Sequence, residues 1–287
     1  MQKKTNQVKT LMDAMPFIKE YNKEIVVIKY GGSAQTSPQL KHNFVKDIAL
    51  LNLVGIKTVI VHGGGAKINE LLNDLNIKNE FIDGHRVTSK ETMRVVEMVL
   101  SGEINNDITS LLNYNGIKAI GISGKDSQCI QAKPKADGKW GYTGEITHID
   151  SKVIQKLIYE NFVPVIAPIA DSKHPGHPGY NINADIVASE IAIALKAKKI
   201  LFLTDIAGVL DDNKKLISSL TPQKTEELIS SGVIAGGMIP KVHSCTHAVN
   251  GGVLKAHIID GRVEHSILLE LFTSDGIGTQ FSSKKDK

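Results

Sequence analysis

The chain has 287 residues, of which 41% are hydrophobic and 22% charged, which is ordinary for a globular protein. Its formal net charge of +4 comes from scattered lysines rather than a basic block, which disfavours nucleic-acid binding. No window approaches the roughly 18 apolar residues of a membrane span, and the first residues lack a signal-peptide core. Cys129 and Cys245 form no CxxC pair, so no disulfide framework or zinc motif is indicated. We therefore expect a soluble, cytoplasmic protein that binds neither nucleic acid nor membrane.

Short apolar runs alternate with helical patterns, which is typical of a parallel sheet with helices on both faces. The first pattern, before residue 22, is an amphipathic helix that Pro16 interrupts. The patterns that follow predict a strand at Ile25–Lys29, a helix at Leu40–Leu53, a strand at Thr58–His62 and a helix at Ala66–Leu75.

The middle of the chain is less regular, because residues 81–88, 129–133 and 140–149 have the pattern of hairpins. Around them we expect helices at Lys90–Leu100, Asn105–Tyr114 and Lys152–Tyr159, strands at Ile117–Ile122 and Val163–Ile166, and a loop at Asp171–Tyr180. The α/β pattern then resumes with a helix at Asn183–Leu195, strands at Lys199–Thr204 and Val253–Ile258, and helices at Gln223–Ser230, Ile239–Asn250 and Glu264–Phe272.

Two loops share one form, in which a buried strand is followed by glycines and then a helix. VIKYGGSA contains Gly31 and Gly32, and VIVHGGGAK contains Gly64 and Gly65. Ligands gather at the carboxyl ends of parallel strands, glycines allow close backbone approach, and helix N-termini attract anions. One such loop is weak evidence, but two on one sheet edge predict an anion site. Neither loop matches the P-loop or the dinucleotide fingerprint, which disfavours a P-loop NTPase and a Rossmann dehydrogenase.

Two lysines lie beside glycines and are candidates to contact an anion. Lys29 ends the first strand, and Lys241 follows a glycine pair at the start of a helix. Two ammonium groups approaching from different parts of the chain would neutralise a phosphoryl group in transfer, although Lys29 alone could equally be a surface lysine. Asp185 lies at the mouth of a helix, where it either favours the helix dipole or faces and orients both lysines.

Arginine is rare in this chain, because Arg86 is one of only three arginines among 34 basic residues. A planar, bidentate donor suits a carboxylate in a way that lysine does not. We therefore favour a ligand role for Arg86 over a structural ion pair.

Taken together, VIKYGGSA, VHGGG, DGHRVT, GxSGKD, NINAD and GGMIPKV closely resemble, in this order, the N-acetylglutamate kinases of the amino acid kinase family. The resemblance runs from about residue 6 to Phe281. It implies a three-layer α/β/α sandwich around a mainly parallel central sheet. It further implies an oligomerisation helix over residues 1–22, a lobe over 23–180 for the acyl amino acid, and a lobe over 181–287 for ATP. The implied reaction moves the γ-phosphoryl group of ATP onto the side-chain carboxylate of N-acetyl-L-glutamate, in arginine biosynthesis.

The resemblance also implies roles for single residues. Lys29 and Lys241 match the two transition-state lysines, and Asp185 matches the aspartate that organises them. The implied substrate contacts are Gly64, Gly65, Arg86 and Asn181, and the implied ATP contacts are Gly31, Gly32 and Asp205. No residue is implied to bind a metal directly, because Mg²⁺ would be held mainly by the nucleotide phosphates.

Both ends of the chain resemble the arginine-inhibited, hexameric branch of this family. The N-terminal helix matches the segment that interlaces dimers into a ring, a trimer of dimers. The implied ligands of L-arginine as effector are Lys199, His257, Glu270 and Gly276. Glu270 is the carboxylate that a guanidinium group needs, while the alternative is a C-terminal helix that only packs. A PII-type signalling protein is a candidate partner of the ring.

Two other functions remain open at this point. An acetylaminoadipate kinase would use the same carboxylate clamp on a substrate one methylene longer. A non-catalytic arginine sensor would keep the effector site but would not need both lysines and Asp185. The segment DSKHPGHPG before NINAD is longer and richer in histidine than the resemblance implies, so the substrate-side loop departs from the pattern.

Overall fold

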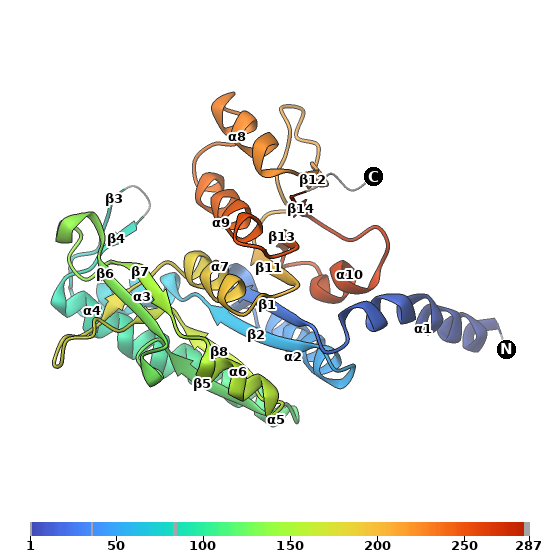
Figure 1. Cartoon of the computed structure of the whole chain (residues 1–287), viewed down its shortest axis with the longest axis horizontal. Coiled ribbons are helices and arrows are strands. Elements are labelled where there is room, and N and C mark those ends of the chain that lie inside the picture. Colours follow the sequence, from blue (N-terminus) through green and yellow to red (C-terminus); the bar gives the residue numbers. More distant parts are fainter. Residues whose placement is uncertain (1, 36, 83–84, 284–287) are drawn as a thin grey trace.

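The computed structural model describes residues 2–35, 37–82 and 85–283, and its centre is an eight-stranded sheet (Figure 1). The strand order is β12-β14-β13-β11-β1-β2-β8-β5, and every neighbouring pair is parallel except β13 and β14. The bounds are β1 (Ile25–Tyr30), β2 (Lys57–His62), β5 (Ala119–Ser123), β8 (Val163–Ala167), β11 (Lys199–Thr204), β12 (Ser219–Leu220), β13 (Lys255–Asp260) and β14 (Thr279–Phe281).

Helices cover both faces of the sheet, so the predicted three-layer α/β/α sandwich is confirmed. Alternate side chains of a strand point to opposite faces, and accordingly Val26 and Ile28 of β1 join one hydrophobic cluster while Val27 joins the other. The first cluster is closed by α2 (Pro38–Leu53), α3 (Gly65–Asp74), α4 (Lys90–Glu97), α5 (Asn105–Tyr114) and α10 (Ser266–Phe272). The second is closed by α6 (Lys152–Tyr159), α7 (Ala184–Ala194), α8 (Pro222–Ser230) and α9 (Met238–Asn250).

The order of the strands places both glycine loops at one point. From β1 the chain adds β2 beside it, then β5 at the edge, and then β8 between β2 and β5; it later returns to the other side of β1 to add β11, β12, β13 and β14. Such a reversal of strand order leaves a crevice at the carboxyl ends of the strands on either side. Because Tyr30 and Val61–His62 are neighbours across the β1–β2 pair, the two glycine loops leave the sheet side by side.

Smaller elements surround this edge. The predicted hairpins are present as β3 (Glu80–Ile82) with β4 (His85–Val87), and β6 (Ile130–Pro134) with β7 (Gly144–Ile149); residues 83–84 of the first turn lie outside the described residues. The sequence patterns missed the short pair β9 (Ile169–Ala170) and β10 (Tyr180–Asn181), which closes the loop at 171–179. Three 3₁₀ turns complete the fold: η1 (Gly32–Gln35), η3 (Asp126–Gln128) and η4 (Lys135–Gly138).

Several boundaries differ from the predictions. β1 continues one residue past Lys29 to Tyr30, and β13 begins at Lys255 rather than Val253. The two predicted helices across residues 90–114 are one continuous rod, because a π-helical segment, η2 (Met98–Ile104), joins α4 to α5. The edge strand β12 and its neighbour β14 were not predicted; both are short, and β14 runs antiparallel to β13.

The N-terminal helix α1 (Gln2–Tyr21) continues through Pro16 and extends away from the rest of the molecule (Figure 1). Its exposed side chains include several large apolar ones: Val8, Leu11, Met12 and Met15. Across the described part of the chain, no helix combines the length and apolarity that a membrane crossing requires. The division into lobes at residues 22 and 180 stays a prediction.

Candidate functional site

The two glycine loops meet at the carboxyl ends of β1 and β2. The backbone N–H of Gly63 donates to the Tyr30 carbonyl at 2.9 Å, and Gln35 Nε2 donates to the carbonyl oxygens of both Tyr30 and Gly63. A methyl group on Gly31 would lie 2.6 Å from Lys29 Nζ. The Lys29 ammonium group can occupy this position only because Gly31 has no side chain.

Gly32 and Gly64 lack side chains for different reasons. Gly32 has a φ of +65°, and a Cβ there would lie 2.5 Å from Asp205 Oδ1. Gly64 is extended, but a Cβ would lie 2.5 Å from Ile104 and Leu100, so its hydrogen allows the loop to pack on η2. Around Gly65 a Cβ would find open space. Gly31, Gly32 and Gly64 therefore each approach side chains of the protein itself, and the predicted approach of the glycines to a ligand stays a prediction.

Asp185 brings Lys29 and Lys241 together, as one of the two alternatives for this residue predicted. Lys29 Nζ lies 3.0 Å from Oδ1, and Lys241 Nζ lies 3.3 Å from Oδ2. The Lys29 contact has the distance of an ion pair without the angles of a hydrogen bond, whereas Lys241 donates one. The Asn183 side-chain oxygen caps α7 by accepting a hydrogen bond from the backbone N–H of Asp185 at 2.8 Å. This cap fixes the position of the backbone from which the Asp185 carboxylate extends.

The charges of this cluster are coupled. Burial raises the pKa of Asp185, but the ammonium groups of Lys29 and Lys241 outweigh burial, so the pKa lies below its ordinary value. Asp185 is therefore an anion that holds two cations, and the three side chains together carry one net positive charge. Lys29 and Lys241 belong to β1 and α9, from opposite halves of the sheet. The arrangement is suited to bind an additional anion between them.

A cavity of about 930 Å³ opens beside this cluster. Its lining includes six of the predicted site residues: Lys29, Gly31, Gly32, Gly64, Gly65 and Asp205. The lining formed by the described residues does not include Asp185, Lys241, Arg86 or Asn181.

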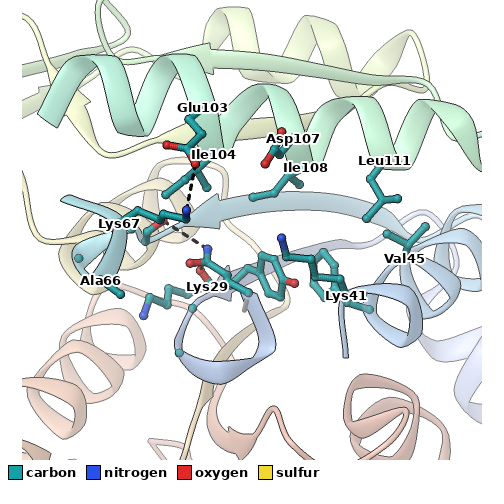
Figure 2. A pocket seen from close by; sticks show the side chains of 18 of the residues that line it. Lys29, Lys41, Val45, Ala66, Lys67, Glu103, Ile104, Asp107, Ile108 and Leu111 are labelled. Carbon is teal, nitrogen blue, oxygen red and sulfur yellow. Dashed lines mark hydrogen bonds and ion pairs between the residues drawn. The ribbon is translucent and has the colours of Figure 1, made fainter. Parts of the chain in front are cut away.

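Figure 2 shows one wall of the cavity formed by η2 and α5, with Glu103, Asp107, Ile108 and Leu111 facing Lys41 and Val45 of α2. Lys67, near the start of α3, lies 3.4 Å from Glu103 and 3.3 Å from Glu70. Sequence reasoning missed Lys41 and Lys67, because the only signal was a lysine in the first turn of a helix that follows a glycine loop.

Arg86 lies in β4 and is buried. Its Nη2 donates to Asn69 Oδ1 at 2.7 Å and to the Gly65 carbonyl at 3.5 Å, Nη1 donates to Asn79 Oδ1, and the guanidinium lies 4.7 Å from the centre of the Phe81 ring. Burial lowers the pKa of Arg86. Among the described residues no carboxylate forms an ion pair with the Arg86 guanidinium, so the structural ion pair considered above is not formed. Sequence reasoning missed the two asparagines, although the AKIN segment places Asn69 one turn into α3.

Asn181 is linked to Arg86 through buried hydroxyl groups. Asn181 Nδ2 donates to Thr88 Oγ1 at 3.2 Å, and that hydroxyl lies 2.9 Å from Thr143 Oγ1 and 3.3 Å from the Arg86 carbonyl. Three of the four predicted substrate contacts, Gly65, Arg86 and Asn181, therefore belong to one hydrogen-bonded group.

His62, directly before the second glycine loop, is fully buried and neutral. Its Nδ1–H donates to the Gly63 carbonyl at 3.0 Å, and Nε2 accepts from Asn105 Nδ2 at 3.1 Å. Burial lowers the pKa of His62 from 6.5 to about 4. These contacts hold the second glycine loop.

A second cavity, of about 290 Å³, lies at the opposite, amino-terminal ends of β11 and β13. Glu270 Oε1 lies 2.7 Å from Lys199 Nζ and 2.8 Å from His257 Nε2, and the Ile277 N–H donates to Oε2 at 2.8 Å. Gly276 has a φ of +58°, and a Cβ there would lie 2.7 Å from Glu270 Oε2. All four residues predicted for the effector therefore line this cavity, together with Phe17, Glu20 and Tyr21 of α1.

The pKa values of Glu270 and His257 are both lowered, as expected for a carboxylate anion between two hydrogen-bond donors. Burial raises the pKa of Glu270, but the hydrogen bond from His257 and the charge of Lys199 bring it below its ordinary value. Burial and the Lys199 ammonium lower the pKa of His257 to about 4, so its neutral ring donates through Nε2. Its Nδ1 is buried and has no hydrogen-bond partner within residues 2–35, 37–82 and 85–283.

Comparison with known proteins identifies related chains. The model of the amino acid kinase family matches residues 24–260. An acetylglutamate kinase from Aliarcobacter butzleri is 63% identical over 275 residues, which cover 96% of this chain and 91% of that protein. An acetylglutamate kinase from Nitratiruptor sp. is 64% identical, over 98% of this chain and 99% of that protein. The fold also resembles N-acetylglutamate synthase from Neisseria gonorrhoeae, with a TM-score of 0.86 at 22% identity; this chain spans 64% of that longer protein.

The buried histidines predict a loss of stability in mild acid. A histidine whose pKa is lowered on folding stays neutral in the folded state while the unfolded state gains a proton, so stability is lost as pH falls from 6.5 to about 4. Each pH unit in this window removes up to about 1.4 kcal/mol per such histidine. We expect His62→Gln to flatten the decline in unfolding free energy, measured by urea titration between pH 7.5 and 4.5. The exposed His148→Gln serves as a control with the wild-type slope, and an equally steep decline in His62→Gln would contradict the assignment.

Proposed function

Because the chain belongs to the amino acid kinase family, we propose that it transfers the γ-phosphoryl group of ATP to the side-chain carboxylate of N-acetyl-L-glutamate. The choice of substrate is supported by relatives named acetylglutamate kinase that are 63% and 64% identical over nearly the whole chain. The chemistry is supported chiefly by one observation, the pairing of Lys29 and Lys241 on Asp185 at the edge where both glycine loops end.

The geometry suits in-line transfer to a carboxylate. A substrate carboxylate oxygen attacks the γ-phosphorus, the bond to the β-phosphate oxygen breaks, and its electron pair leaves with ADP, giving an acyl phosphate. The nucleophile is already an anion, so no general base is needed. Asp185, whose pKa is lowered by Lys29 and Lys241, is therefore not required as a base and can orient the two lysines instead. Lys29 and Lys241 neutralise charge on the moving group, and Gly31 and Gly32 let backbone amides approach it.

The substrate contacts follow from the same arrangement. Arg86 offers the guanidinium for the α-carboxylate, and it is held beside Gly65 by Asn69 and Asn79. Asn181 and the amides of Gly64 and Gly65 complete the contacts to the acyl amino acid. Asp205, beside Gly32, belongs to the ATP side, and Mg²⁺ would be held mainly by the nucleotide phosphates.

We extend the proposal to regulation by L-arginine in the second cavity. Glu270 is a buried carboxylate aimed into a space of about 290 Å³, where a guanidinium could make a bidentate contact. The Gly276 segment is close enough for its backbone to contribute, since even a methyl group there would touch Glu270.

Assembly and location belong to the same proposal. The apolar side chains of Val8, Leu11, Met12 and Met15 are each more than half exposed on α1, which favours burial against a second copy in a hexamer built from three dimers. Such a ring could bind a PII-type signalling protein. Both cysteines are buried as free thiols, which suits the reducing cytoplasm.

The substrate is tested by an ADP-release assay. We expect N-acetylglutamate to be phosphorylated with a kcat/KM at least about fivefold above that of N-acetylaminoadipate, because one methylene changes selectivity by roughly 1–3 kcal/mol. A preference for the longer substrate would identify an acetylaminoadipate kinase instead, and no ADP release with either would favour the sensor.

The catalytic lysines are tested one at a time. Lys29→Ala and Lys241→Ala should each lower kcat by roughly a hundredfold or more, because each removes a preorganised charge from the transition state. Lys224→Ala, which removes an exposed lysine paired with Glu227 on α8, is the matched control and should retain wild-type kcat. Near-normal kcat in either catalytic variant would refute its role.

The effector site is tested by titrating L-arginine into the same assay. Millimolar arginine should inhibit the wild type, and Glu270→Gln should weaken inhibition at least about tenfold, because a hydrogen-bonded charge partner is lost. The exposed Glu264→Gln should behave like the wild type, and KM for N-acetylglutamate reports whether Glu270→Gln stays folded. Unchanged inhibition in Glu270→Gln would move the effector site elsewhere.

A further inference from the structure

Asp47 of α2 and His265, the residue before α10, form a partly buried contact between segments 218 residues apart. His265 Nδ1 lies 2.5 Å from Asp47 Oδ1. The Asp47 side chain is 3% exposed, whereas that of His265 is 43% exposed. His265 occupies the N-cap position of α10 but its side chain makes no capping bond. Asp47 therefore holds the residue at the N-terminal end of α10 from a different helix.

The backbone around this contact is arranged to meet α2 closely. His265 has a φ of 56° and a ψ of 32°, a left-handed conformation that is unfavourable for a residue with a Cβ. The segment before it also approaches η1, because a Cβ on Gly261 would lie 3.2 Å from the Cβ of Ala34. The segment between β13 and α10 thus contacts both α2 and the turn that follows Gly31.

The two helices joined by Asp47 belong to the two cavities. Lys41, Phe44 and Val45 of α2 line the catalytic cavity, immediately before Asp47. Glu270 of α10 lines the effector cavity, one turn after the end of the helix that His265 precedes. A displacement of α10 therefore reaches the catalytic wall through the Asp47–His265 contact as well as through the hydrophobic cluster that the two helices share.

We propose that Asp47 is a positioning residue that couples the effector cavity to the catalytic cavity. The proposal rests on the arginine site inferred above and explains how a ligand on Glu270 affects phosphoryl transfer. A ligand that draws Glu270 toward the cavity displaces α10, and the contact of His265 with Asp47 moves α2 with it. Inhibition then requires only that arginine and the substrates favour different positions of α10.

A polar group without a partner lies close to Asp47. Asn43, one turn earlier on the same face of α2, has a buried Nδ2 that makes no hydrogen bond to any described residue. Asn43, Asp47 and His265 share the lining of a small void of about 10 Å³. Burial also raises the pKa of Asp47 to about 6, against the opposing hydrogen bond from His265. The Asn43 amide lacks an acceptor, and the Asp47 carboxylate lies in an apolar setting. A shift of α10 can therefore change which hydrogen bonds these two side chains make.

The test measures thermodynamic coupling. The Kd of L-arginine is determined by calorimetry without substrates, and again with saturating N-acetylglutamate and a non-hydrolysable ATP analogue. We expect the wild-type ratio of the two Kd values to be at least about fivefold. Asp47→Asn removes the charge, and His265→Asn removes the imidazole while tolerating a left-handed backbone. Both should bring the ratio to within about twofold of unity, with the substrate-free Kd within about threefold of the wild-type value.

A matched control comes from another histidine–carboxylate pair. His247 Nε2 lies 2.8 Å from Glu190 Oε1 between α9 and α7, on the exposed surface, so His247→Gln should keep the wild-type ratio. An unchanged ratio in Asp47→Asn and His265→Asn overturns the proposal. Loss of arginine binding in both overturns it too, because the contact would then only shape the effector cavity.

Failure of the effector site itself is distinguishable. If the wild type does not bind arginine, the regulatory part of the proposed function falls, and hydrogen exchange decides whether Asp47 positions both helices. Increased amide exchange across both α10 and α2 in Asp47→Asn supports the positioning role, while an increase confined to α10 overturns it.

Discussion

The structure depends on one buried carboxylate that holds two ammonium groups from opposite halves of the sheet. Without Asp185, Lys29 and Lys241 would repel each other in a setting of low dielectric, and neither would have a fixed direction. With it, the two lysines form a clamp that retains one positive charge. β1 supplies the first lysine, α9 the second, and the Asn183 cap sets the position of the carboxylate between them. The glycines beside Lys29 follow from the same need, since any side chain at Gly31 would displace the ammonium group.

A second buried carboxylate, Glu270, repeats the pattern at the other end of the sheet with a different consequence. Lys199 begins β11 while Lys29 nearly ends β1, and Lys29 is in register with Phe202, so the two clusters lie at opposite ends of adjacent strands. Communication between them must run either through the sheet or around it. The helices α2 and α10 pack in the same hydrophobic cluster on one face, which makes the route around the sheet short.

The sequence predicted most of the fold, because buried strands, glycine turns and helix starts depend on local patterns. The same patterns singled out Lys29, Lys241 and Asp185 as candidates but left alternatives open for Lys29 and Asp185, and only the fold shows that the three side chains meet. The patterns failed where a longer-range contact decides the outcome. β14 has only three residues and exists because it pairs with β13, and Asn79 matters only because Arg86 folds back onto it. Asp47 reads in the sequence as a polar residue on a surface helix, and only the fold brings His265 to it.

The clamp is tested most directly by a crystal structure with ADP, aluminium fluoride and N-acetylglutamate, in which the fluoride stands in for the phosphoryl group in transfer. We expect the Nζ atoms of Lys29 and Lys241 to lie within about 3 Å of that group, on opposite sides of it, while Asp185 still contacts both lysines. A structure in which either ammonium group remains on Asp185 alone, away from the fluoride, would contradict it.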